Sequence, residues 1–152
     1  MLKIYHAQGA RSLRVLWLCE EMGVPYETAE ASFFKPSDEF KAINPLRTVP
    51  AMQDGDVRIV DFHAEVTSEK VALGWYLDGR VSAVLGTHTH VTTADEQIFS
   101  GGTAFQCDVG MTGPHESILG RRIDRVMETT ITFQPTQFDV AEGDVRLCGT
   151  IV

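Results

Sequence analysis

Paired cysteines, basic residues and long apolar runs are all scarce in this 152-residue sequence. The three cysteines are an odd number without CxxC spacing, which argues against a disulfide framework and against a thiolate-rich zinc site. They indicate a reducing, cytoplasmic setting. No run of about 18 apolar residues occurs, and the first residues do not place an apolar run behind a basic start. Membrane spanning and secretion are therefore both disfavoured.

The shortage of basic residues gives a formal net charge of -8, from 13 Lys and Arg against 21 Asp and Glu. That charge repels a phosphate backbone, and no long cluster of Lys and Arg offsets it locally, so wrapping of nucleic acid is not expected. Hydrophobic residues make up 43% and charged residues 22% of the chain, which is typical of packed globular proteins. At this length we expect one core, with two small lobes sharing a core as the alternative.

The first part of the chain predicts alternating strands and helices. Apolar residues recur in short runs or on one helix face, and Gly and Pro separate them. The expected elements are a strand over 2–5, a helix over 13–22, a strand over 26–31 and a short helix over 37–42. Gly23 should end the first helix and Ser37 should cap the second. This order predicts a right-handed βαβ unit at the N-terminus.

Two stretches of this first part resemble the N-terminal thioredoxin-like domain of glutathione S-transferases. They read YHAQGARSLRVLWLCEEMGVPYE and FKAINPLRTVPAMQDGD, within residues 1–58. The resemblance implies glutathione binding by Ser12, which would stabilise the thiolate from a helix N-terminus, and by Val49 and Pro50, a cis-proline position in that family. The sequence departs from the family after the QDGD hairpin, where RIVDFHAE replaces the Glu-Ser pair, and the helical second domain is missing. A glutathione-binding module without catalysis is therefore one alternative.

The second part of the chain predicts a strand-helix-strand unit. Alternating or β-branched apolar residues mark its strands, and an apolar face marks its helix. The expected elements are a strand over 57–62, a helix over about 67–77 and a parallel strand over 81–85. Thr67 or Ser68 should cap the helix, and Asp78-Gly79 should end it. Because the strands are parallel, their carboxyl ends should meet at one edge of the sheet.

Three histidines follow these strand ends: His63 comes after the first strand, and His88 and His90 come after the second. In an extended segment residues i and i+2 point to the same side, so His88 and His90 should face one or two ions, with His63 close by. Imidazole suits Fe, Mn or Zn, which predicts a divalent transition metal; hydrogen-bonded histidines without a metal are the alternative. Asp61 and Glu65 are candidates to orient the first histidine by hydrogen bonding, or are simply solvated carboxylates.

The stretch that contains VDFHAE, GTHTHV and DVGMTGP is similar to the C-terminal half of bacterial metallophosphoesterases of the cyclic-nucleotide phosphodiesterase type. The similarity spans about residues 60–152. It implies that His63 and His88 hold one ion of a dinuclear site and that His90 holds the other. It also implies two-metal hydrolysis of a small phosphodiester such as a cyclic nucleotide. The carboxylate, asparagine and GNH histidine ligands of that family's N-terminal half have no counterpart here, so the bridging carboxylate is missing.

The last part of the chain predicts a β-hairpin. Residues 130–152 alternate between apolar and polar types, and Glu142-Gly143-Asp144 is typical of a turn. Pro135 places its strand at a sheet edge, and these strands should complete a sheet of the sandwich. A small basic cluster precedes them, which we interpret as a solvated helix face in preference to a phosphate contact. It consists of Arg121, Arg122 and Arg125.

Together these features predict a mixed α/β protein in which a truncated thioredoxin-like βαβ fragment, residues 1–59, is joined to half of a metallophosphoesterase-type α/β sandwich, residues 60–152. The join is expected between Asp56 and Asp61, where no linker composition occurs, so both parts should share one sheet. Such a chain is a chimera. An open sheet edge at the join favours a homo-oligomer. The predicted function is metal-dependent phosphodiester hydrolysis or an inactive remnant of it; the alternatives are the glutathione-binding module and a folded chimera without activity.

Overall fold

The computed structural model describes residues 1–10, 12–32, 34–44, 49 and 51–152, and the protein is mixed α/β, as predicted. Seven strands form the main sheet: β1 (Leu2–His6), β2 (Tyr26–Glu30), β3 (Ala51–Asp54), β4 (Val57–His63), β5 (Ala83–Thr87), β6 (Gln97–Ile98) and β7 (Ala104–Gln106). The helices are α1 (Leu13–Met22), α2 (Asp38–Ile43), α3 (Thr67–Leu77) and α4 (Ile123–Thr132). A separate two-stranded sheet consists of β8 (Gly113–Pro114) and β9 (Val145–Arg146).

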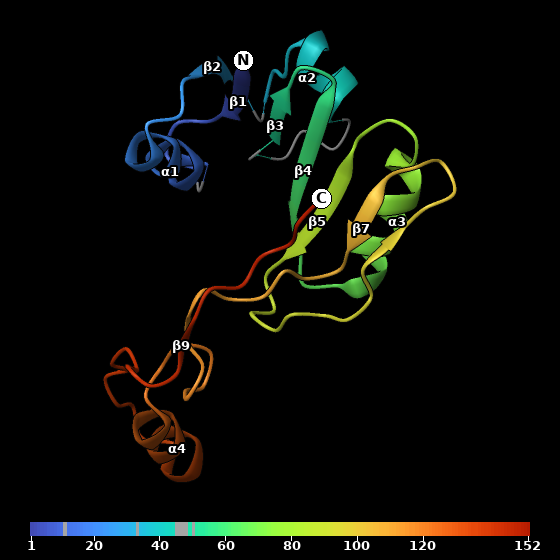
Figure 1. Ribbon diagram of the computed structural model, residues 1–152. Coiled ribbons are helices and arrows are strands. Elements are labelled where there is room, and N and C mark those ends of the chain that lie inside the picture. The colour runs from blue at the N-terminus through green and yellow to red at the C-terminus, as the bar shows by residue number, and fades with distance from the viewer. Residues whose placement is uncertain (11, 33, 45–48, 50) are drawn as a thin grey trace.

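Both parts of the chain contribute to the main sheet, whose strand order is β2-β1-β3-β4-β5-β7-β6 (Figure 1). β1 and β2 are parallel and are connected by α1, which is the predicted βαβ unit. β4 contains the predicted join, and it runs antiparallel to β3 on one side and parallel to β5 on the other. The shared sheet that the sequence predicts is therefore present.

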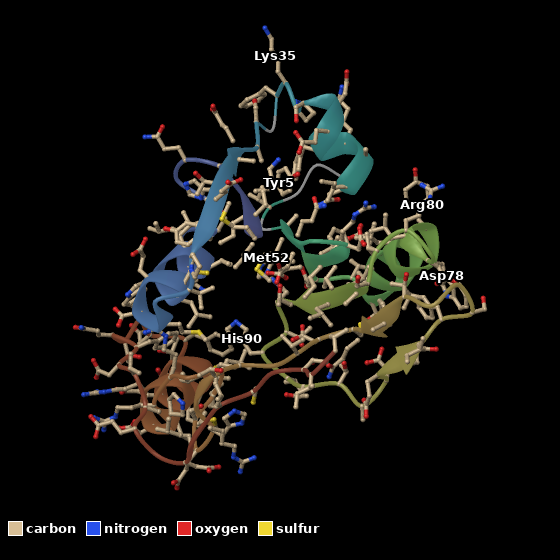
Figure 2. All side chains as sticks on the ribbon, turned by 45° about the horizontal axis from the view of Figure 1, so that its top comes forward. Tyr5, Lys35, Met52, Asp78, Arg80 and His90 are labelled. Carbon is tan, nitrogen blue, oxygen red and sulfur yellow. The ribbon has the colours of Figure 1, made fainter. Side chains whose placement is uncertain are left out.

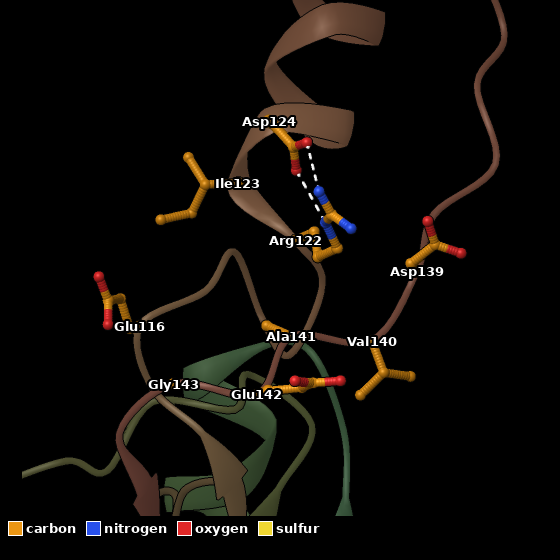
Figure 3. Close-up of a pocket in the computed structure, with 9 residues that line it drawn as sticks. All are labelled: Glu116, Arg122, Ile123, Asp124, Asp139, Val140, Ala141, Glu142 and Gly143. Atoms are coloured by element: carbon orange, nitrogen blue, oxygen red, sulfur yellow. Dashed lines mark hydrogen bonds and ion pairs between the residues drawn. The ribbon is translucent and has the colours of Figure 1, made fainter.

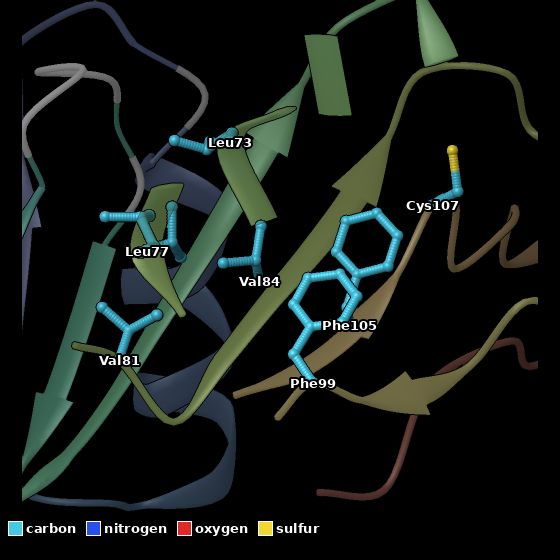
Figure 4. Close-up of a cluster of buried hydrophobic side chains, with 8 residues drawn as sticks. Leu73, Leu77, Val81, Val84, Phe99, Phe105 and Cys107 are labelled. Carbon is cyan, nitrogen blue, oxygen red and sulfur yellow. The ribbon is translucent and has the colours of Figure 1, made fainter. Parts of the chain in front are cut away.

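One face of the sheet is packed beneath α2 and α3. Directly opposed residues of neighbouring strands point to the same face, and one such row is buried from β1 to β7. This row consists of Tyr5, Ala51, Val60, Val84 and Phe105. Phe40 of α2 stacks on Tyr5, with ring centroids 5.1 Å apart. α3 covers the other end of the row with Leu73 and Leu77 (Figure 4), so the hydrophobic core lies on this face.

The opposite face is covered less completely. α1 approaches it through Val15, which borders a hollow of about 220 Å³ together with Met52, Ile59 and Leu85. These three sheet residues are only half-buried. Side chains alternate along a strand, so Asp61 of β4 points to this same face. The strand ends that carry the histidines therefore emerge on the side of α1, away from the core under α3.

The helix ends follow the sequence predictions in three cases and contradict them in one. Asp78 is the C-cap of α3, as predicted. Gly23 adopts the left-handed conformation, with φ of 63°, at the end of α1. Ser37 caps α2, because its Oγ accepts a hydrogen bond from the backbone N–H of Phe40 at 3.1 Å. The predicted cap of α3 by Thr67 or Ser68 is wrong. The helix begins one residue earlier, and Val66 occupies the N-cap position without a side-chain hydrogen bond.

The predicted C-terminal hairpin is also wrong. α4 extends to Thr132, and the two residues of β9 pair with β8 instead of with a strand of residues 130–140. Helical spacing of Ile123, Met127 and Ile131 outweighs the short alternation that follows them. In addition, the hydroxyl of Thr130 donates to the carbonyl of Val126 within the helix at 2.8 Å.

α4, β8 and β9 form a small lobe beside the main sheet (Figure 1). None of the α4 residues is buried, and apolar side chains such as Ile131 are exposed. The lobe therefore contributes little to the core of the protein. Among the helices that the structure describes, none combines the length and the apolar character needed to cross a membrane.

Candidate functional site

His63 and His88 lie next to each other at the carboxyl ends of β4 and β5. Nε2 of His63 is 3.1 Å from Nδ1 of His88, and the two rings meet edge to face at 76°. The parallel register explains this contact, because His63 pairs with Thr87, and His88 is the next residue. The structure thus brings these two histidines together, as the parallel topology predicts.

His90 reaches the same pocket through a bent backbone and not through an extended one. The φ angles of His88 and His90 are 127° and 66°, both outside the range that L residues usually adopt. The prediction of an extended segment is therefore wrong. The segment bends because Oδ2 of the buried Asp108 accepts a hydrogen bond from the backbone N–H of Thr89 at 2.8 Å, which draws the segment inward. Within the described ranges, no three His, Cys, Asp or Glu side chains come close enough to hold a metal ion.

A series of hydrogen bonds determines which ring nitrogen of His63 carries the proton. The hydroxyl of Thr87 donates to Oδ1 of Asp61 at 2.8 Å, and Nδ1 of His63 lies 3.1 Å from the same hydroxyl oxygen. Since the hydroxyl proton is directed at Asp61, Nδ1 of His63 must be the donor to Thr87. The lone pair of the ring is then on Nε2, which points to His88.

Asp61 is the last acceptor in this series of hydrogen bonds, and its environment differs from that of Glu65. Burial raises the pKa of Asp61 above its usual value of 3.8, while the hydrogen bond from Thr87 and the nearby His63 act in the opposite direction. Asp61 is therefore linked to His63 by hydrogen bonds through Thr87, and its orienting role stays a prediction. Glu65 is exposed and does not line the histidine pocket, which favours the solvated interpretation for this residue.

The spacing of the two close nitrogens fits one divalent ion. An ion about 2.0–2.1 Å from two imidazole nitrogens, at an angle of about 90–110°, separates these nitrogens by about 2.8–3.4 Å. The observed distance of 3.1 Å between Nε2 of His63 and Nδ1 of His88 lies in this range. The orientation of His63 by a neighbouring hydroxyl and carboxylate is also typical of metal-binding histidines. In the structure this contact is itself a hydrogen bond between the two rings, and its length is also compatible with two ligands of one ion.

A buried ion pair between Lys70 and Asp108 supports the site, and it was not predicted from the sequence. Its Nζ and Oδ2 are 3.0 Å apart, and 1% of each side chain is exposed. Oδ1 of Asp108 also accepts the N–H of Gly110 at 3.0 Å. One sequence signal was available: Lys70 shares the helical spacing of Leu73 and Leu77 and therefore lies on the apolar face of α3.

The histidines open into a pocket of about 620 Å³ that both parts of the chain line. α1 and the residues before it form one wall, and the ends of β4 and β5 with the turn before β8 form the other. The lining residues are Ala10, Arg14, Val15, Val49, Asp61, His63, Thr87, His88, His90, Gly110, Met111 and Thr112. In Figure 2, His90 lies well away from Arg80 and Asp78.

The residues predicted to bind glutathione are only partly in a position to do so. Ser12 is buried, and its Oγ lies 2.9 Å from Nδ1 of His6 and accepts the N–H of Ala7 at 3.4 Å. These contacts weigh against a direct contact between this hydroxyl and a thiolate. Val49 faces the histidine pocket, and Pro50 lies outside the described residues.

A second hollow, in the C-terminal lobe, is lined by four carboxylates and one arginine (Figure 3). The guanidinium of Arg122 donates to both oxygens of Asp124, at 3.1 and 2.8 Å. Arg125 lies 3.5 Å from Glu128 and 3.9 Å from Asp139. Carboxylates thus neutralise much of the basic cluster, as expected for a solvated helix face, and the hollow is poorly suited to a phosphate.

The family to which the chain belongs follows from its match to a known protein family. Residues 2–152 match the family described as YmdB-like protein. The chain belongs to this family. The match includes both the segment that resembles glutathione S-transferases and the segment that contains the histidines. The division into residues 1–59 and 60–152 and the chimeric origin stay predictions, as does the homo-oligomer.

Two of the three relatives of this YmdB-like chain described next carry functional names, and the third is a hypothetical protein. The chain is 56% identical over 93 residues to a 2',3'-cyclic-nucleotide 2'-phosphodiesterase of Bacillus subtilis, a match that covers 61% of the chain and 35% of the relative. A crystal structure of a hypothetical protein from Thermus thermophilus is 43% identical, with a TM-score of 0.58, and covers 73% of the chain. A crystal structure of a phosphatase from Mycoplasma pneumoniae is 37% identical, with a TM-score of 0.55, and covers 70%. The chain spans about 35–43% of the length of these relatives.

Proposed function

We propose that this YmdB-like chain carries the histidine part of a metal-dependent phosphodiester hydrolase that acts on a small substrate such as a cyclic nucleotide. The observation that carries this proposal is the separation of 3.1 Å between Nε2 of His63 and Nδ1 of His88. The functional names of a phosphodiesterase and a phosphatase among the relatives support it. His63 and His88 would share one ion, and His90, on the wall of the same pocket, would hold a second.

The hydrogen bonds of the site give each residue a defined task. Thr87 keeps the proton of His63 on Nδ1, so that the lone pair is on Nε2, which faces Nδ1 of His88. His88 would have to carry its proton on Nε2 to present Nδ1 in the same way. A divalent Fe, Mn or Zn ion, when bound, lowers the pKa of a water molecule and neutralises charge on phosphoryl oxygens. The chain itself orients the His63 ligand through Thr87 and Asp61.

Metal content of protein purified without a histidine tag tests the proposal. We expect wild-type protein to retain a transition ion and His63→Ala and His88→Ala to lose most of it. His115→Ala is the matched control, because this histidine lies outside the pocket and contacts the carbonyl of Met111. Equal metal content in wild type, His63→Ala and His88→Ala would reject the proposal.

Turnover separates an active hydrolase from an inactive remnant. With Mn or Fe added, we expect the wild type to hydrolyse bis(p-nitrophenyl) phosphate and His88→Ala to do so at least about a hundredfold more slowly, since a metal ligand is lost. Metal retention without any turnover would identify the chain as a remnant that binds metal but lacks catalysis.

A further inference from the structure

We infer that the histidine pocket continues into the apolar hollow beneath α1, and that the two form one binding site for a phosphodiester that carries an aromatic group. In this site Arg14 holds the phosphate and the hollow receives the ring. The inference rests on the proposed function for the nature of the ligand. It adds a place for the aromatic group and a phosphate-binding residue, neither of which the metal site alone provides.

The two cavities adjoin each other, because three residues border both of them. The pocket of about 620 Å³ and the hollow of about 220 Å³ are both bordered by Val15, Asp61 and Thr87. Thr87 also contacts His63, so the entrance of the hollow lies directly beside the histidine pair. A ligand bound at the histidines would therefore lie next to the hollow, and we infer that its ring occupies it.

The hollow itself has the chemistry of an aromatic-ring site. Beyond the shared residues it is lined mainly by Met52, Ile59, Leu85 and Val109, which are all half-buried. Apolar cavities of about 150 Å³ accept benzene, so about 220 Å³ is sufficient for one ring. Burial of a flat apolar group here would also cover the sheet face that α1 leaves partly open.

Arg14 supplies the charge that a phosphodiester needs. It lies on α1, on the wall opposite the histidines, and it is the only Lys or Arg among the described residues that line the pocket. Its guanidinium forms no ion pair or side-chain hydrogen bond with the part of the chain that the structure describes. A guanidinium in this state can donate two parallel hydrogen bonds to a phosphate.

Direct binding of two slowly hydrolysed probes tests the inference independently of turnover. Calorimetric titration of the full chain should show diphenyl phosphate binding about tenfold more tightly than dimethyl phosphate, because only the first has rings to bury. Arg14→Gln should weaken both probes about tenfold, since the charge-assisted bonds are lost. Met52→Gln should weaken diphenyl phosphate alone.

Two matched variants control for general effects. Arg80→Gln removes an exposed arginine that stacks on Tyr76 and does not line the pocket, and Met22→Gln changes an exposed methionine at the end of α1. Both should bind the probes as the wild type does, and thermal unfolding should confirm that every variant is folded. Equal affinities for the two probes, or an unchanged affinity in Arg14→Gln, would overturn the inference. Probe binding with this pattern but without turnover would reject the hydrolase and keep the binding site.

Discussion

Nζ of Lys70 and Oδ2 of Asp108 are 3.0 Å apart in an ion pair that is almost completely shielded from solvent. The same carboxylate also accepts the backbone N–H groups of Thr89 and Gly110. One buried group therefore connects α3, the bent segment of His88 and the turn that follows β7. The pocket depends on this connection, because the backbone at His88 has an unusual positive φ that needs support from its surroundings.

Replacing Lys70 by Met should destabilise the protein by about 3–5 kcal/mol, since a buried carboxylate would lose its cation. Urea unfolding would measure the change. Lys41→Met is the control, because this lysine pairs with Asp38 at the surface and should have little effect. Similar losses in the two variants would contradict a special contribution from the buried pair.

Asp108 should also make the unfolding free energy decrease as the pH falls into the acid range. Burial alone raises the pKa of this carboxyl, but hydrogen bonds from Thr89, Gly110 and Lys70 outweigh it and hold the pKa below the usual 3.8. A lowered folded pKa gives stability that is present above the unfolded pKa and is lost as the pH falls through the folded value.

Below about pH 4, the unfolding free energy of the wild type should therefore fall more steeply than that of Asp108→Asn, which has no carboxylate to protonate at this position. Urea unfolding at a series of acidic pH values would compare the slopes. Parallel curves for the two proteins would show that Asp108 does not cause the acid sensitivity.

Thr87→Val should reduce metal affinity by about 10–100-fold, because Nδ1 of His63 loses its acceptor and the ring loses its fixed protonation state. Thr87→Ser keeps the hydroxyl and should bind metal nearly as the wild type does. Zinc titration in competition with a chromophoric chelator would measure both. If Val and Ser have the same effect, the hydroxyl does not orient His63.

Gly86→Ala should destabilise the protein by about 1–3 kcal/mol, because the new Cβ would overlap the carbonyl oxygen of Cys107 and force the backbone apart. Gly149→Ala is the matched control, since nothing lies within 4 Å of its added Cβ. Thermal unfolding of the two variants would compare them. An unchanged melting temperature in Gly86→Ala would show that the two backbones can separate at low cost.

Local patterns in the sequence were sufficient for most of the main sheet. The alternation in β4, the apolar face of α1 and the glycine at residue 23 act over a few residues, and the strands and helices form where they predict. The C-terminal lobe was mispredicted because residues 123–132 carry helical spacing next to an alternating stretch. Helical spacing decides the structure there, and the predicted hairpin strands do not form.

The candidate site was predictable to the extent that strand topology controls it. Parallel pairing of β4 and β5 places His63 beside His88, and this follows from the strand order alone. The bend at His88 and His90 depends on Asp108, which is 19 residues beyond Thr89 in the sequence. The contribution of Arg14 depends on how α1 packs across the sheet. Contacts between residues so far apart in the sequence leave no periodic pattern from which they could be predicted.

The position of β4 between an antiparallel and a parallel neighbour makes its length critical. Ile59, Asp61 and His63 alternate with the buried Val60, so insertion or deletion of a single residue between Val60 and His63 would turn the imidazole toward α3. A change of two residues would keep the original side. In related sequences, insertions or deletions in this strand should therefore comprise an even number of residues, or the strand length should be unchanged.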